Sequence, residues 1–393
     1  MYSNPAADNI AQTQSTHALN MSTSSLSDDQ RLDMYLFQRP VPTSKKVRQQ
    51  LTPKQLANKY KLTRLAQIKA NEKGIEQDHV NITLINEMHG FSDLNELDRE
   101  GAMQISNALS FYPKNAKKKK LFKGLTGYDV IIKNQSLEKP EECLSPYTVT
   151  KICGVMSTYM NFCKDLGYVS ENQFYKLKTT KKKQKQKRLP FNDDELSLIF
   201  NMSDYSNLYF LHPYYYWIPL LLRFTGARLN EVCQLLRSDV RIVDGIKCFV
   251  FTDDGENQRV KSVNANRTVP IHSTLLKRGF WEFAKSGSSD LIFPELKLVK
   301  GYYSHNASKW FMRRRKQLGL SRGKDAHSFR HSAINELKQQ EVPDALITDL
   351  VGHEQQTETM STYSQQYRPS ILQPYVEMID DSHVVHIPPY TFK

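Results

Sequence analysis

The chain has 393 residues, enough for two domains that each bury a core, and a formal net charge of +13. This excess of positive charge favours a polyanionic partner, nucleic acid first. Five cysteines without a CxxC pair argue against a disulfide framework and a zinc ribbon, and predict a protein of the reducing cytoplasm. The apolar runs are too short to span a bilayer and no signal-peptide core opens the sequence, so no membrane partner is expected.

The N-terminal segment over residues 1–49 is rich in polar side chains and has little apolar periodicity. We expect it to be disordered. A helix is predicted to begin at Thr52, which can cap it ahead of Pro53. The helical pattern continues to about Glu72, and Gly74 is the expected stop.

Further helical pieces are expected over residues 76–112, with breaks at Gly90 and Gly101. A longer helix is predicted from Ser145, which is again followed by a proline. Its apolar side chains recur at spacings of three and four, which gives one buried stripe. Residues 50–177 are therefore predicted to form a small all-helical domain.

Two basic stretches are candidates for contact with DNA phosphates, with a solvated loop as the alternative for the first. The second, over residues 178–188, has seven basic residues and no apolar one, so residues 178–190 are predicted to be a linker lying on DNA. The candidate phosphate contacts are Lys117, Lys118, Lys119, Lys120, Lys181, Lys182, Lys183, Lys185, Lys187 and Arg188.

A second domain is predicted over residues 191–369, opening at Asn192, which can form a capping box with Glu195. Helices are expected over 193–202 and 213–236. Four short strands are predicted: Val240–Val243, Lys247–Thr252, Val260–Val263 and Arg267–Ile271. The rest of the domain reads as helical, so the fold class is mainly α with a small antiparallel β-sheet in the C-terminal domain.

The chemistry of the second domain begins at Arg228, which follows Thr225-Gly226 and opens a helical turn. Glu231 lies three residues on, where it shares a face with Arg228 and can hold the guanidinium in place. His327 and Arg330 have the same spacing at the start of another helix, where backbone N–H groups favour an anion.

A further helix is predicted from Pro343 to Gly352, which places His353 just past its end and Tyr363 ten residues beyond. Two arginines, two histidines and a tyrosine make a poor metal site, because carboxylate ligands are missing. They suit a site that grips a phosphodiester and attacks it with a phenol oxygen. No metal and no cofactor are expected.

Over residues 190–368 the chain resembles the tyrosine recombinase (phage integrase) family. The first arginine box of the family is similar to WIPLLLRFTGARLNEVCQLLRSDV, and the second to HSFRHSAINELKQQEVPDALITDLVGHEQQTETMSTY. The lysine-bearing β-hairpin is similar to VKSVNANRTVPIH. Residues 76–175 are more loosely similar to the helical core-binding domain of the family.

The resemblance implies a role for six residues. Arg228 and Arg330 would bind the phosphate, Tyr363 would be the nucleophile, and Lys261 would be the general acid. His327 would accept the phenol proton, and His353 would hydrogen-bond the phosphate. The spacing from His353 to the tyrosine is slightly longer than is common in the family, which leaves Tyr367 as a rival nucleophile. Lys247 is the alternative for the lysine.

The family resemblance also implies the reaction and the partners. The protein would be a site-specific DNA recombinase, an integrase of a phage or other mobile element that cuts and rejoins strands through a 3′-phosphotyrosine. Two domains would clamp double-stranded DNA at specific recombination sites, with self-association to a tetramer and an excisionase or host DNA-bending protein as further partners. The tail over residues 370–393 would dock on a neighbouring protomer, with Val384–Ile387 as a docking strand.

Two other functions remain open from sequence. A type IB topoisomerase uses the same phosphotyrosine chemistry, and a DNA-binding regulator could have lost catalysis. Some residues near the boxes have structural interpretations too. His331 is expected to be scaffold, residues 214–217 are expected to pack beneath the first arginine box, and residues 313–315 are equally compatible with a solvated face and with phosphate contact.

Overall fold

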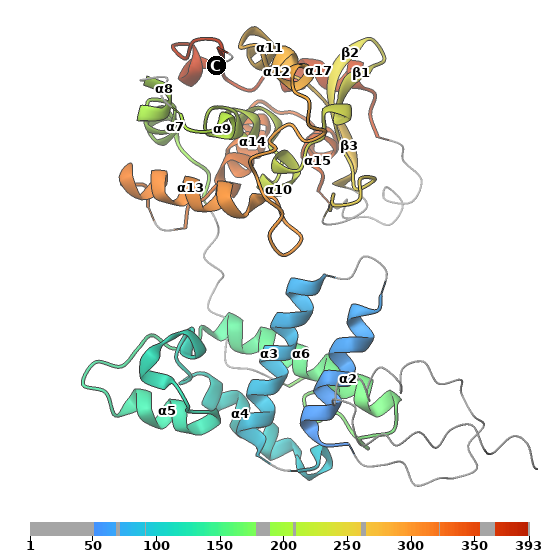
Figure 1. Cartoon of the computed structure of the whole chain (residues 1–393), viewed down its shortest axis with the longest axis vertical. Helices are drawn as coiled ribbons and strands as arrows, with labels where there is room; N and C mark the ends of the chain where they lie inside the picture. The colour runs from blue at the N-terminus through green and yellow to red at the C-terminus, as the bar shows by residue number, and fades with distance from the viewer. Residues whose placement is uncertain are drawn as a thin grey trace, which may run out of the picture. The chain divides into compact units, whose positions relative to one another are not determined.

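The computed structural model describes residues 51–67, 71–90, 92–177, 189–206, 210–260, 265–321, 323–353 and 366–391. The chain divides into two compact units, the first ending at Gln184 and the second beginning at Lys185 (Figure 1). The predicted disordered segment and nearly all of the predicted basic linker lie outside the described residues. Within the described residues, no helix has the length and apolar character needed to cross a membrane.

The N-terminal unit is helical in its described residues, with short 3₁₀ turns between the longer helices (Figure 1). Its helices are α2 (Pro53–Leu65), α3 (Glu72–His89), α4 (Arg99–Leu109), α5 (Gly127–Gln135) and α6 (Pro146–Asp165). The predicted caps are present: Thr52 accepts a hydrogen bond from the backbone of Gln55, and Ser145 accepts one from Thr148. The apolar stripe of α6, including Met156, is buried against α2 and α3.

Two glycines of this unit were assigned wrongly as helix breaks. Gly74 lies in the first turn of α3, where its backbone N–H donates to the capping side chain of Asn71. Gly101 lies in the first turn of α4, where it donates in the same way to Asp98. A glycine costs little at a helix start that a side chain already caps, so the cap residue decides. Gly90, with φ of 76°, ends α3 as predicted, and Gly167, with φ of 73°, follows the end of α6.

The C-terminal unit combines helices with one small sheet, which confirms the predicted fold class (Figure 1). The α-helices are α7 (Asp193–Phe200), α8 (Ser203–Ser206), α9 (Pro213–Thr225), α10 (Leu229–Cys233), α11 (Ser273–Lys277), α12 (Phe280–Ser286), α13 (Ser304–Gln317), α14 (His327–Gln339), α15 (Asp344–Val351) and α17 (Pro369–Val376). The strands are β1 (Val240–Val243), β2 (Ile246–Phe251) and β3 (Arg267–Pro270). The predicted capping box of Asn192 and Glu195 opens α7.

The sheet is antiparallel in the order β1-β2-β3. The turn between β1 and β2 uses Asp244 and Gly245, both at positive φ, as a tight hairpin requires. Phe251 at the end of β2 pairs with Arg267 at the start of β3. Of the predicted strand Val260–Val263, Val260 is outside any strand and the other three residues are not among those described.

Helix α9 lies in the core of this unit, and it is apolar on almost every side. Tyr216, Trp217 and Leu220 are fully buried, as expected for packing beneath the first arginine box. The predicted helix over 213–236 was wrong in length, because α9 ends at Gly226 in the left-handed conformation with φ of 57°. This backbone conformation favours glycine, and a Cβ at Gly226 would also make a tight contact of 3.0 Å with Val351.

The C-terminal residues pack on their own unit. Val384 and Ile387 are buried in its core, and the hydroxyl of Tyr216 donates to the carbonyl of Pro388 at 2.6 Å. The prediction of a strand at Val384–Ile387 was wrong, because Val384 ends a 3₁₀ turn (Ser382–Val384) and its carbonyl accepts from Arg278. Docking of the tail on a neighbouring protomer stays a prediction.

Candidate active site

Arg228 is the N-cap of α10, directly after the turn at Gly226. Its guanidinium donates to Oε1 of Glu231 at 2.6 Å, and its backbone N–H donates to Oε2 of the same carboxylate at 3.0 Å. The contact expected from the three-residue spacing is therefore present. The Arg228 side chain keeps 22% of its surface exposed, so it can reach a ligand from solvent.

Arg330 lies in the first turn of α14, and only 1% of its surface is exposed. Its guanidinium donates to three backbone carbonyls: to Gly226 at 2.9 Å, to Gly352 at 3.3 Å and to Val351. These carbonyls belong to the turn after α9 and to the end of α15. Arg330 therefore ties together the two segments that precede Arg228 and His353.

The carbonyl of Gly352 is shared by both predicted phosphate-binding arginines. It accepts from Nη2 of Arg228 at 3.2 Å and from Nη2 of Arg330 at 3.3 Å. Gly352 adopts φ of 69°, which ends α15 as predicted, and the exposed His353 follows it. The structure thus brings Arg228, Arg330 and the backbone of His353 to one place.

His327 is the first residue of α14, one turn before Arg330. Its backbone N–H donates to Asp325 at 2.8 Å, so the carboxylate of Asp325 occupies this backbone donor at the helix start. The half-buried His327 ring meets the ring of His331 edge to face, with centroids 4.9 Å apart. His331 therefore contacts a predicted catalytic residue as well as belonging to the scaffold.

A third arginine, Arg267, completes the cluster, although no sequence motif predicts a role for it. Its side chain is 1% exposed and donates to Oε2 of Glu231 at 2.9 Å. It also donates to the carbonyls of Leu350 and Ala265, each at 2.9 Å. The available signal was an arginine at the start of the short strand Arg267–Pro270, where a buried guanidinium would require a partner.

Among the described residues, this cluster has more positive than negative charge, since Arg228, Arg267 and Arg330 surround the carboxylate of Glu231. Burial alone would raise the pKa of Glu231, but Arg267 and Arg228 outweigh it and hold that pKa below its ordinary value. Burial, with Arg228 and Arg267 nearby, lowers the pKa of Arg330. An anion placed against these guanidiniums would relieve the imbalance.

Comparisons with known proteins agree with this geometry. Residues 192–368 match the family model of the phage integrase family. The chain is 27% identical over 233 residues to a "Probable integrase/recombinase" of Aquifex aeolicus (strain VF5). The matched region covers 53% of this chain and 72% of that protein. The region from Asn192 to Arg368 belongs to the phage integrase family. Accordingly, the protein is an enzyme of the tyrosine recombinase type, a DNA strand transferase.

Solved structures show the same fold at low sequence identity. The Tn1549 transposon integrase, solved in complex with circular intermediate DNA, has a TM-score of 0.53 at 16% identity, with 80% of this chain and 96% of that chain covered. The lambda integrase tetramer bound to a Holliday junction has a TM-score of 0.53 at 18% identity, with 84% and 86% covered. These likenesses establish the integrase fold of the described residues.

Lys261 and Tyr363, the predicted general acid and nucleophile of the integrase domain, lie outside the described residues. Their alternatives are described. Lys247 lies over the ring of Trp281 at 4.8 Å, four residues along β2 from Phe251, the partner of Arg267. That spacing corresponds to about 13 Å of strand, so the backbone of Lys247 lies well away from the arginine cluster.

Tyr367, the rival nucleophile, is 40% exposed, and its backbone N–H donates to Asp349 of α15 at 3.0 Å. Its main chain is thus tied to the helix that leads to His353. Nothing in the described residues places its hydroxyl at the arginines.

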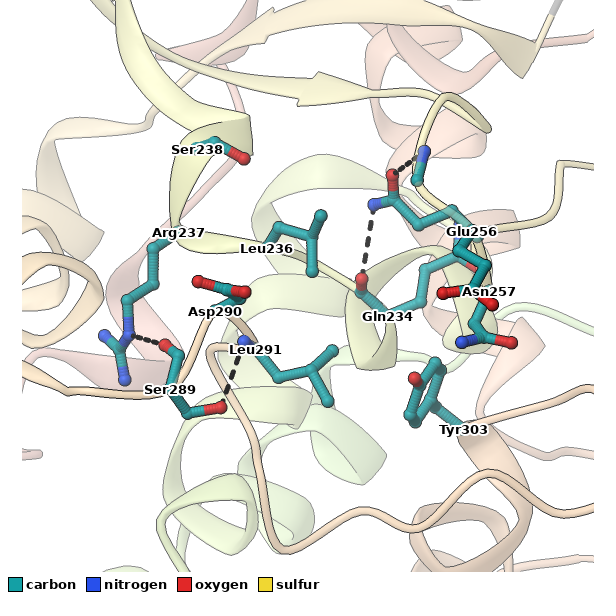
Figure 2. Close-up of a pocket in the computed structure, with 12 residues that line it drawn as sticks. Gln234, Leu236, Arg237, Ser238, Glu256, Asn257, Ser289, Asp290, Leu291 and Tyr303 are labelled. Atoms are coloured by element: carbon teal, nitrogen blue, oxygen red, sulfur yellow. Dashed lines mark hydrogen bonds between the residues drawn. The ribbon is translucent and has the colours of Figure 1, made fainter.

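A hollow of the C-terminal unit lies at a different place (Figure 2). It has a volume of about 530 Å³ and is lined by the carboxylates of Glu256 and Asp290. Arg237, the cation among its lining residues, donates to the carbonyl of Ser289 at 2.6 Å (Figure 2). It also donates to the carbonyls of Phe283 and Ala284. Carboxylates would repel a phosphate there, so the arginine cluster remains the candidate site.

The lysine run of the N-terminal unit divides into two kinds of side chain. Lys117 pairs with Glu87 at 3.2 Å, and Lys119 pairs with Glu141 at 2.5 Å. Lys118 and Lys120 are exposed. The linker candidates, all between residues 181 and 188, lie outside the described part of the chain.

The three consecutive arginines of α13 also differ in their contacts. Arg314 forms a bidentate pair with the buried Asp204, and Arg315 donates to the carbonyl of Lys324. Arg313 is exposed, so of the three it is the one whose side chain remains a candidate for phosphate contact. No group of metal-binding side chains is found among the residues that the structure describes.

Proposed function

We propose that this protein recombines double-stranded DNA at specific sites, with Tyr363 as the nucleophile, and that it integrates or excises a phage or other mobile element. Arg228 and Arg330 bind the scissile phosphate. His327, His353 and Lys261 supply the proton transfers and the remaining hydrogen bonds. The reaction needs no cofactor, because the covalent phosphotyrosine keeps the energy of the broken phosphodiester.

One observation carries the proposal: two guanidiniums predicted to bind phosphate share the carbonyl of Gly352. Two cations held this close repel one another unless an anion lies between or beside them. A phosphodiester fits, since guanidiniums donate to its non-bridging oxygens in pairs and stabilise the charge that grows there in the transition state. The carboxylate of Glu231 only partly offsets three arginines.

The proposed step balances as a phosphoryl transfer. The phenol oxygen of Tyr363 forms a bond to phosphorus, and the bond from phosphorus to the 5′ oxygen breaks. His327 accepts the phenol proton, and Lys261 gives a proton to the leaving 5′ oxygen. His353 donates a hydrogen bond to the phosphate. Attack by a 5′ hydroxyl on the phosphotyrosine then reverses these steps and joins the new strand.

The assembly follows from what related proteins do. The lambda integrase has been solved as a dimer on a core site and as a tetramer on a Holliday junction. We propose that four copies of this chain act together on two duplexes, in the cytoplasm and on the nucleoid. Lys118, Lys120 and the basic residues from 181 to 188 would contact phosphates outside the active site. An excisionase or a host DNA-bending protein would set the direction of the reaction.

The test is covalent trapping on nicked duplexes that carry the junctions of the element. The nick lets a short fragment leave after cleavage, so the phosphotyrosine cannot be resealed. We expect a protein–DNA adduct that resists SDS with the natural protein and is absent with Tyr363→Phe. Tyr367→Phe is the matched control, and it should form the adduct normally.

Other results would give different answers. An adduct that persists in Tyr363→Phe but disappears in Tyr367→Phe would move the nucleophile to Tyr367. No adduct, despite tight binding to verified sites, would contradict catalysis and favour a DNA-binding regulator. Relaxation of supercoiled plasmids of any sequence by a single copy of the chain would favour the topoisomerase alternative.

A further inference from the structure

The strongest unassigned feature of the molecule is the environment of Arg267. Its guanidinium is buried, and its central carbon lies 4.2 Å from the ring centroid of Phe251, the residue opposite on β2. Burying an arginine is costly unless its donors are satisfied. Its donors go to Glu231 and to the carbonyls of Leu350 and Ala265. The fold therefore maintains a buried charged group whose hydrogen bonds go to oxygens of the protein itself.

The partners of Arg267 belong to three separate parts of the site. Glu231 holds Arg228 through both of its oxygens. Leu350 lies in the last turn of α15, whose next carbonyls accept from Arg330 and which leads to His353. Ala265 is the first residue described after the segment that contains Lys261. One side chain thus fixes the distances between all three.

The carboxylate of Glu231 could not hold Arg228 in the same way alone. Its Oε2 accepts from the backbone of Arg228 at 3.0 Å and from Arg267 at 2.9 Å, while Oε1 accepts from the Arg228 guanidinium at 2.6 Å. Without Arg267, the carboxylate of Glu231 would contact the guanidinium of Arg228 alone. The Glu231 side chain could then rotate and move that guanidinium. A displacement of about 1 Å at a reacting group can cost about 10²-fold in rate.

We infer that Arg267 is a positioning residue for strand cleavage, which acts through Glu231 to hold Arg228 against the scissile phosphate. Arg267 itself does not touch DNA. This inference rests on the proposed function, because it assigns Arg228 to the phosphate.

The test compares two substrates with Arg267→Met. One is the nicked duplex with an ordinary phosphate, and the other has a methylphosphonate at the scissile position. Replacing one oxygen by methyl removes a negative charge, so a well-placed arginine matters less. We expect Arg267→Met to slow single-turnover cleavage of the phosphate by about 10²-fold, and cleavage of the methylphosphonate by far less. Arg228→Met should show the same preference.

Arg237→Met is the matched control. Arg237 also donates to backbone carbonyls in the same unit, but it lies at the hollow of Figure 2 and has no contact with Glu231. Its loss should change the melting temperature and leave the ratio of the two cleavage rates as in the natural protein. Arg267→Lys keeps the charge but not the planar fork, so it should give an intermediate ratio.

Each outcome decides the question. Equal slowing of both substrates by Arg267→Met, or no slowing, would overturn the positioning role while the proposed function stands. If Arg267→Met does not fold, the ratio measured for Arg267→Lys decides, and a natural ratio would overturn the inference. Absence of an adduct with the natural protein would overturn both, and that result is visible before any variant is compared.

Discussion

The two units carry their positive charge in opposite ways. In the N-terminal unit, Lys117 and Lys119 meet carboxylates at the surface, and Lys118 and Lys120 face solvent. In the C-terminal unit, Arg267 and Arg330 are buried beside the partly exposed Arg228, and the cluster shares the carbonyl of Gly352 and the carboxylate of Glu231. Exposed charges are screened by salt and cost little to hold, whereas buried charges are expensive and fixed. The first kind suits affinity for a polyanion, and the second suits chemistry on one phosphate.

Removal of a buried arginine is the strongest test of this difference between buried and exposed charge. Arg330→Met should slow cleavage by about 10²- to 10³-fold, because one preorganised donor to the charged transition state is lost. Binding to the same duplex should fall much less. The measurement is single-turnover adduct formation beside an equilibrium binding curve, at a temperature where circular dichroism shows the variant folded. Equal losses in binding and cleavage would contradict a role in chemistry.

Removal of the carboxylates compares the two environments directly. Glu231→Gln should lower the free energy of unfolding by about 3–5 kcal/mol, because buried guanidiniums lose their counter-charge. Glu141→Gln, which breaks the surface pair with Lys119, should cost about 1 kcal/mol or less. Urea unfolding of both variants measures the difference. Similar losses would show that burial does not separate the two clusters.

The same two variants should also differ in how their free energy of unfolding depends on pH. The pKa of Glu231 is lower in the folded protein than its ordinary value. Its contribution to stability is therefore fully present above the pKa of the unfolded chain and is lost as the pH falls through the lowered folded value. In acid titrations of unfolding, Glu231→Gln should lose this part of the pH dependence and Glu141→Gln should keep it.

Glycine replacement tests how tightly the buried cluster is held. Gly352 and Gly245 both have positive φ, but a Cβ at Gly352 would lie 2.9 Å from Nη1 of Arg267, and one at Gly245 meets nothing. Each alanine should cost about 1–2 kcal/mol through the left-handed backbone. Only Gly352→Ala should also slow cleavage, because it displaces Arg267. Equal cleavage rates for the two variants would contradict the close packing around Gly352.

Local signals in the sequence predicted the parts of this structure that depend on near neighbours. The cap at Ser145 and the pair of Arg228 with Glu231 involve residues three apart, and both are present. Arg267 and Glu231 are 36 residues apart, so no spacing rule could join them. Gly226, by contrast, was a local signal for the end of α9, and the helix predicted over 213–236 wrongly continued past it.

The smallest expected effect concerns the exposed lysines. The double variant Lys118→Ala/Lys120→Ala should weaken DNA binding uniformly across sequences. Each lysine that contacts a phosphate releases a counterion from the DNA on binding, and the variant loses two such contacts. The slope of log affinity against log salt should fall by about 1.8. Lys117→Ala/Lys119→Ala removes the same charge from side chains already paired with Glu87 and Glu141, so its slope should change less. Equal changes would mean that surface pairing does not decide which lysines reach the DNA, and the lysine run would then act only through its total charge.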